Sequence, residues 1–186
     1  MLPSYLTMRR KRAVVSHLAI TVADLERAAA FYSEVFGLER AASPYEGRGR
    51  RLSAVMEVED AQLEGLFLGD GHVFLELLRY ESGFRGRPLP HRDDELGYAH
   101  LSFLVDDVDE VGALVEQHGG ELRGTTRAEF PFGDGAPTVI AFCTDPDGNR
   151  IELIEHRDAA GRAAHAAFLQ AGGIGWPPPE APAPWT

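Results

Sequence analysis

The stretch that decides the fold is residues 16–37, SHLAITVADLERAAAFYSEVFG, because its plan occurs twice in the chain. Residues 99–120, AHLSFLVDDVDEVGALVEQHGG, follow it at a constant offset, so that His17 corresponds to His100. In each copy a short alternating run predicts a strand, and apolar residues at helical spacing then predict a helix. An internal repeat of this kind indicates two modules built alike.

The ends of both predicted helices carry the residues that helix ends need. Asp24 and Asp107 directly precede the helical runs, where a short carboxylate accepts hydrogen bonds from the free N–H groups of the first turn. Gly37 and Gly119-Gly120 follow them, and glycine takes the left-handed conformation that often ends a helix. We therefore expect each helix to begin and end at these positions.

The later part of each half repeats as well. Residues 74–80, FLELLRY, align with residues 150–156, RIELIEH, so that Glu76 corresponds to Glu152. We predict further strands over 51–58 and 137–143, and loops over 43–49, 81–96 and 129–136. Each half is thus predicted to be a βαβββ module whose last strand carries one glutamate. This glutamate is either an ordinary solvent-facing residue or a carboxylate that points into a site.

These elements predict an α+β fold. The domains expected are an N-terminal extension (1–13), a first module (14–83), a linker (84–97), a second module (98–157), and a C-terminal helix with a Pro-rich tail (158–186). The helix is expected over 159–171, and proline excludes helix or central strand from the tail.

Composition narrows the class of protein. The chain has 186 residues and a formal charge of −11, which argues against a nucleic-acid partner apart from the short basic run at 9–12. No apolar stretch approaches the ~18 residues that span a membrane, and none resembles a signal peptide. The single cysteine, Cys143, excludes an internal disulfide and a cysteine-based zinc cluster. We expect an acidic cytoplasmic protein.

The repeat isolates four polar residues, two from each half. His17 and His100 lie on the first strands, Glu76 and Glu152 lie on the last strands, and all four oppose the apolar faces. A lone histidine or a lone glutamate on a strand is usually an ordinary surface residue. Here both recur at corresponding places, and two imidazoles with two carboxylates suit a divalent transition metal. If the two halves curl into one open barrel, the four side chains converge inside it.

The quoted stretches, together with GYAHLSFLVDDVDE and DPDGNRIELIE, resemble the vicinal oxygen chelate superfamily over about residues 14–157. This superfamily includes glyoxalase I, extradiol dioxygenases and bleomycin-resistance proteins. The resemblance implies paired βαβββ modules that form an open, cup-shaped mixed β-barrel around one divalent ion (Ni, Co, Zn, Mn or Fe). It implies His17, Glu76, His100 and Glu152 as the ligands.

A His/Glu/His/Glu set is similar to that of glyoxalase I, which implies an isomerase, lyase or epimerase that moves a proton next to a metal-bound carbonyl. Glu152 or Glu76 would carry the proton, and the symmetry of the repeat does not choose between them. Thr21, Tyr98 and Ser102 share the inner faces and are candidates for lining the pocket of a small oxygenated substrate. Two alternatives remain: an Fe(II) ring-cleaving dioxygenase, and a protein that sequesters a drug or metabolite.

The chain departs from bacterial glyoxalases at two positions that grip glutathione. Thr21 stands where they carry an arginine, and Tyr80 stands where they carry an asparagine. The resemblance therefore implies the reaction class more firmly than the substrate. We expect a homodimer, and the sequence leaves open whether the site closes within one chain or between exchanged halves of two chains.

Overall fold

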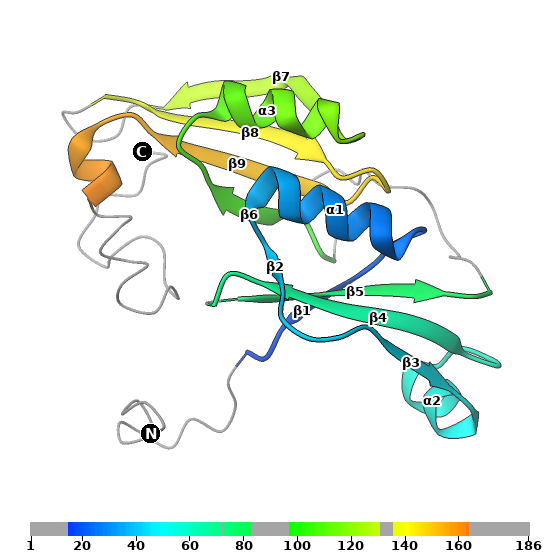
Figure 1. Ribbon diagram of the computed structural model, residues 1–186. Helices are drawn as coiled ribbons and strands as arrows, with labels where there is room; N and C mark the ends of the chain where they lie inside the picture. Colours follow the sequence, from blue (N-terminus) through cyan, green and yellow to red (C-terminus); the bar gives the residue numbers. More distant parts are fainter. Residues whose placement is uncertain (1–14, 72, 83–96, 131–135, 164–186) are drawn as a thin grey trace, which may run out of the picture.

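The computed structural model describes residues 15–71, 73–82, 97–130 and 136–163. Two βαβ-type modules follow one another along the chain, each with its own sheet (Figure 1). The basic run at 9–12, most of the expected linker and the Pro-rich tail lie outside the described residues. Residues 159–163 are helical, at the start of the C-terminal helix that the sequence predicts.

The first module forms a five-stranded sheet in the order β1-β5-β4-β2, with β3 also paired to β4. Its elements are β1 (Leu18–Thr21), α1 (Leu25–Phe36), β2 (Glu39–Arg40), β3 (Tyr45–Arg48), α2 (Arg50–Met56), β4 (Gln62–Gly69) and β5 (Phe74–Tyr80). Strand β1 is parallel to β5, and the other pairs are antiparallel.

The second module forms a four-stranded sheet in the order β6-β9-β8-β7. Its elements are β6 (Leu101–Leu104), α3 (Val108–Gln117), β7 (Glu121–Phe130), β8 (Thr138–Thr144) and β9 (Arg150–His156). Here too the first strand is parallel to the last strand, and the remaining pairs are antiparallel. The α+β class and the pair of similar modules are confirmed, with two open sheets in the described chain and no closed barrel.

The helix ends are confirmed as well. The carboxylate of Asp24 accepts a hydrogen bond from the backbone N–H of Arg27, and Asp107 caps α3 through the N–H groups of Asp109 and Glu110. Gly37 ends α1 with φ at +69°, the left-handed conformation that a residue with a Cβ rarely adopts.

The prediction of a strand over 51–58 is wrong, and the loop predicted over 43–49 contains strand β3. Residues Arg50–Met56 form the short helix α2. Leu52, Val55 and Met56 are spaced at i, i+3 and i+4, so the same apolar residues also fit a helix, and a short run does not separate the two periods. Helix α2 connects β3 to β4, so one of the antiparallel partners of β4 is the segment that we predicted to be a loop.

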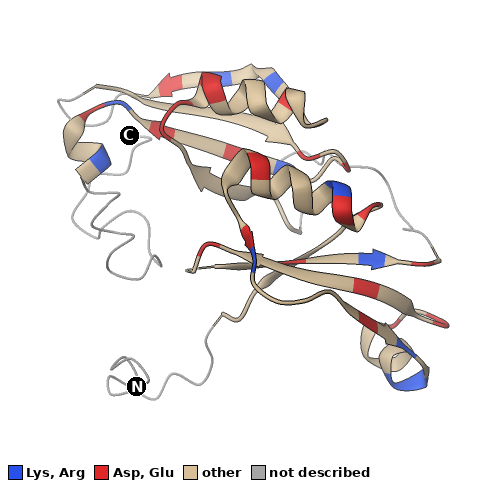
Figure 2. Cartoon of the chain, viewed as in Figure 1, with Lys and Arg blue, Asp and Glu red and all other residues tan. Residues whose placement is uncertain are grey.

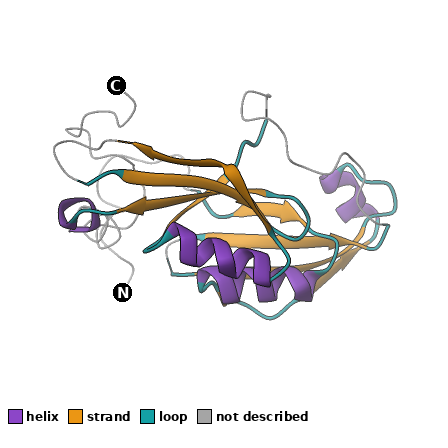
Figure 3. Ribbon diagram, turned by 90° about the horizontal axis from the view of Figure 1, so that it is seen from above, coloured by secondary structure: helices purple, strands orange, loops and turns teal. Residues whose placement is uncertain are grey.

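The two modules share one hydrophobic core, which is centred on their helices. Helix α1 packs on its own sheet, α3 packs on the other, and the two helices lie side by side (Figures 1 and 3). The rings of Phe36 and Phe103 stack across the junction, with centroids 3.9 Å apart. Each helix covers one face of its sheet, and the apolar side chains at alternate strand positions point toward that helix.

The turn between β8 and β9 joins the modules through a buried carboxylate. Asp145 is 2% exposed and accepts a hydrogen bond from the hydroxyl of Tyr32 in α1, at 3.1 Å. Its other hydrogen bonds come from Asn149 and from the backbone N–H groups of Asp147 and Asn149. Burial raises the pKa of Asp145, and these four donors oppose that rise. Asp147 adds an ion pair with Arg27 at the edge of the same contact.

Acidic residues occur on helices, strands and connecting segments of both modules, as Figure 2 shows, so the charge of −11 is not confined to a single surface element. Among the described helices, none has the length and apolar character that crossing a bilayer requires.

The link between Asp145 and Tyr32 leads to a first prediction. Replacing Tyr32 with Phe removes the hydroxyl and leaves the ring, so we expect the free energy of unfolding to fall by about 1.5–3 kcal/mol, the usual contribution of a hydrogen bond to a charged group. Chemical denaturation measures it. Tyr98→Phe is the matched control, because the Tyr98 hydroxyl donates no hydrogen bond to a described residue; equal stability of Tyr32→Phe and wild type would contradict the role given to this contact.

Candidate metal centre

The first half-site consists of His17 and Glu76. Strand β1 is parallel to β5 with Ala19 opposite Glu76, so His17 precedes β1 on the same face of the sheet as Glu76. The flanking residues Leu75 and Leu77 are 3% and 0% exposed and face the core. The alternation of side chains along a strand therefore turns Glu76 away from α1. The Nε2 atom of His17 lies 3.1 Å from Oε2 of Glu76.

Three neighbours support this pair. The hydroxyl of Tyr45 in β3 donates a hydrogen bond to Oε1 of Glu76, the carboxylate oxygen that does not face His17. Burial raises the pKa of Tyr45, and the hydrogen bond to Glu76 raises it further, so Tyr45 stays protonated and donates. The Ser16 hydroxyl lies 3.1 Å from Nδ1 of His17, and the ring of His17 meets that of Phe67 edge to face at 5.4 Å.

The second half-site repeats this construction with His100 and Glu152. Strand β6 is parallel to β9, with Ser102 opposite Glu152. The Nε2 atom of His100 lies 3.4 Å from Oε2 of Glu152, and Ser102 donates a hydrogen bond of 2.8 Å to that same oxygen. The flanking residues Ile151 and Leu153 are fully buried, which fixes the direction of Glu152 in the same way.

A phenylalanine lies across the strand from each glutamate, and sequence reasoning missed this pair. Phe67 is opposite Glu76, and Phe142 is opposite Glu152. The ring of His100 meets Phe142 edge to face at 5.2 Å, as His17 meets Phe67. The sequence repeats this feature too, because a phenylalanine precedes each glutamate by nine or ten residues. In both halves the ring limits where the imidazole can turn.

The two half-sites are not gathered into one centre within the chain. Across residues 15–71, 73–82, 97–130 and 136–163 there is no group of three or more His, Cys, Asp or Glu side chains placed to hold one metal ion. Each half-site lies on the face of its sheet opposite the helix of its own module. The described part of a single chain therefore presents two separate His–Glu pairs.

The candidate pocket residues have separate surroundings. Thr21 is exposed at the end of β1, on the face that carries Glu76. Ser102 is bonded directly to Glu152. Burial, and to a smaller extent the charge of Asp145, raise the pKa of Tyr98 to about 12. On the same face as Glu152, the guanidinium of Arg150 lies 4.1 Å above the ring of Phe142 and brings a cation to the second half-site.

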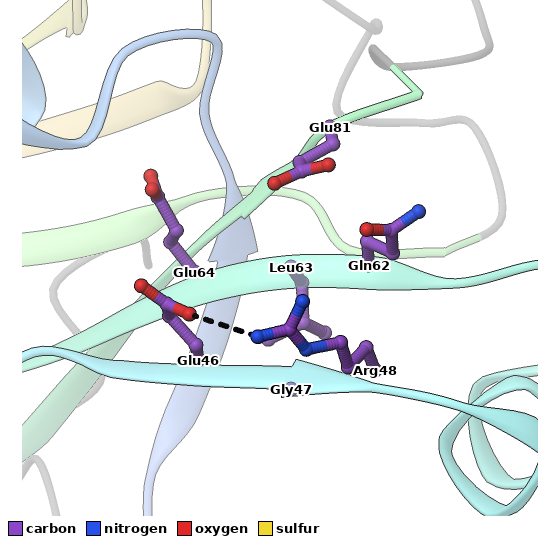
Figure 4. A pocket seen from close by; sticks show the side chains of 7 residues that line it. All are labelled: Glu46, Gly47, Arg48, Gln62, Leu63, Glu64 and Glu81. Atoms are coloured by element: carbon purple, nitrogen blue, oxygen red, sulfur yellow. Dashed lines mark ion pairs between the residues drawn. The ribbon is translucent and has the colours of Figure 1, made fainter.

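A separate shallow hollow lies along the paired strands β3 and β4 (Figure 4). Its lining contains three carboxylates, Glu46, Glu64 and Glu81, and Arg48 lies 3.9 Å from Glu46. The lining contains no histidine, and the cation partly neutralises it. This hollow is separate from both half-sites, and its lining contains no His–Glu pair.

The fold is a pair of α+β modules, each with a His–Glu pair on the sheet face opposite its own helix. A model of the Glyoxalase/Bleomycin resistance protein/Dioxygenase superfamily matches residues 14–153, and the chain belongs to this superfamily. The chain is 32% identical over 146 residues to the lactoylglutathione lyase of Salmonella typhimurium and 33% identical over 148 residues to that of Escherichia coli O157:H7. Each match covers 77% of this chain and 93% of the relative.

Solved structures agree on the fold. A glyoxalase family protein from Bacillus cereus superimposes with a TM-score of 0.66 at 23% identity, over 80% of this chain and 98% of that one. Glyoxalase I of Leishmania major gives a TM-score of 0.51 at 24% identity, over 84% and 95% of the two chains. These two likenesses concern the fold alone, and the sequence relatives above support a glyoxalase-type enzyme of the superfamily.

Proposed function

We propose that the chain is a metal-dependent lyase or isomerase in which His17, Glu76, His100 and Glu152 together hold one divalent ion. The observation that carries this proposal is that two His–Glu pairs of the same construction stand at corresponding places in two modules. In each pair a nitrogen and a carboxylate oxygen lie side by side, as two ligands of one ion must. The donors suit a first-row ion such as Ni, Co, Zn, Mn or Fe.

The centre is completed by a second copy of the chain. One chain supplies the ligands in separate pairs, and each pair lies on a sheet face that the module's own helix leaves uncovered. In a symmetric dimer the first module of one subunit can face the second module of its partner, and the two-fold axis then generates two equal four-ligand centres. The homodimer and the shared site are thus one proposal.

The two glutamates have different hydrogen bonds, which assigns them different roles. Both oxygens of Glu76 have a neighbour, because Tyr45 donates to Oε1 and His17 faces Oε2. In Glu152, Ser102 and His100 both contact Oε2, and Oε1 accepts no hydrogen bond from a described residue. Glu152 therefore has the oxygen that can take up and return a proton, and Glu76 stays a ligand.

The reaction is a proton transfer at the carbon next to a carbonyl. The bound ion would polarise the carbonyl oxygen and stabilise the negative charge that develops there. Glu152 removes the proton and delivers it to the neighbouring carbon, while Ser102 holds the carboxylate in place. The substrate is a small oxygenated compound. Thr21 and Tyr80 replace the arginine and asparagine that bind glutathione in bacterial glyoxalases, so any thiol group of the substrate is expected to differ from glutathione.

Metal content is the first test. We expect about one divalent ion per chain after purification with metal, and removal by a chelator should lower the melting temperature. Restoring the ion at a thousand times its Kd should stabilise the folded state by about 4 kcal/mol. A chain that binds less than one ion and melts unchanged after chelation would be a binding protein of this fold, and the proposal would be wrong.

Mixing two variants tests whether the centre lies between subunits. His17→Ala and His100→Ala should each lose metal and activity. After the two proteins are unfolded and refolded together, half of the dimers are hybrids with one intact centre and one doubly altered centre, so about a quarter of the wild-type activity should return. If each centre lay within one chain, no mixture would recover any. A mixture of His17→Ala with Glu76→Ala, which alter the same half-site, is the control and should stay inactive.

Deuterium exchange tests the chemistry. In D₂O the enzyme should catalyse exchange of the proton next to the carbonyl of methylglyoxal thiol adducts, observed by proton NMR, and Glu152→Gln should slow the exchange by about 10²–10⁴-fold. Adducts of glutathione and of smaller thiols are compared in parallel. Oxygen consumption with catechols and Fe(II), without any such exchange, would instead make the protein a ring-cleaving dioxygenase.

A further inference from the structure

The first half-site contains a tyrosine whose position requires a glycine on the neighbouring strand. Tyr45 in β3 is the cross-strand partner of Gly65 in β4. A Cβ added at Gly65 would overlap the Cζ and hydroxyl atoms of Tyr45, so the ring lies directly over the backbone of the glycine. The absence of a side chain at position 65 is what allows the ring to lie flat across β4.

This position brings the tyrosine to the glutamate. The Tyr45 hydroxyl crosses β4 to reach Oε1 of Glu76 on β5, and the Tyr45 ring stacks on Phe67 with centroids 6.0 Å apart. Phe67 in turn meets His17 edge to face. Both proposed ligands of the first half-site are therefore held by the same pair of aromatic rings.

The second half-site has no equivalent of this arrangement among the described residues. There the hydroxyl of Ser102 donates to Oε2 of Glu152, the oxygen that faces His100. In the first half-site the donor takes the opposite oxygen and leaves Oε2 directed at His17. Tyr45 thus restricts rotation of the Glu76 carboxylate without occupying its ligating oxygen.

We propose that Tyr45, seated over Gly65, is a positioning residue that holds Glu76 with Oε2 and the Nε2 atom of His17 directed at one metal ion. This inference rests on the proposed function. An outer partner of a metal-ligating side chain fixes its orientation before the ion arrives, and removing such a partner usually lowers metal affinity by about 10–100-fold.

Cobalt(II) binding tests the inference without any substrate. The dissociation constant is measured by competition with a chromophoric chelator, and the visible spectrum of the bound ion reports its ligand geometry. Tyr45→Phe, which removes only the hydroxyl, should weaken binding about 10–100-fold and alter the spectrum. Gly65→Ala should do the same by displacing the intact tyrosine. Gly124→Ala is the matched control, because a Cβ at this strand position meets no atom within 4 Å.

The outcomes separate the inference from the proposal on which it rests. If wild type and Tyr45→Phe bind Co(II) with the same affinity and spectrum, Tyr45 has no positioning role and the four-ligand centre stands. A Tyr45→Phe variant that loses folding stability but keeps both readouts also overturns the inference, since its tyrosine would be structural alone. If wild type itself binds no cobalt, the proposed function and the role of Tyr45 both fail.

Discussion

The buried contact between Asp145 and Tyr32 is the constraint on which the arrangement of this molecule depends. It ties the turn that leads into β9 to helix α1 of the other module, next to the stacked rings of Phe36 and Phe103. A carboxylate that is 2% exposed is stable only when its oxygens are bonded, and Asp145 has four donors. The contact holds the modules helix to helix and leaves the other face of each sheet uncovered.

The uncovered faces carry the proposed metal ligands. Alternation along β5 and β9 buries a leucine or isoleucine on each side of the glutamate, so the packing that stabilises the core also directs the carboxylate. The two halves differ around the glutamates, because Tyr45 donates to Glu76 and Ser102 donates to Glu152.

Local sequence patterns predicted much of the fold because the same strand, helix cap and terminal glycine occur in both halves of the repeat. The caps at Asp24 and Asp107, the glycine at 37 and the glutamate strands are short-range features, set by backbone geometry within a few residues. The segment at 51–58 was predicted wrongly because its apolar residues fit two periods and its helix has no counterpart in the described part of the second module. Tyr45 escaped notice because its role depends on Gly65, which adjoins it only after β3 and β4 pair.

The sequence by itself determined the family, the two modules, and the correspondence of His17 with His100 and of Glu76 with Glu152, because the repeat and its alternating strands are local patterns. Only the tertiary structure decided that the pairs stay apart within one chain, since this depends on how α1 packs against α3. It also decided which carboxylate oxygen each hydroxyl contacts, because a side chain's partners across a sheet are set by strand order, and strand order is not a local property.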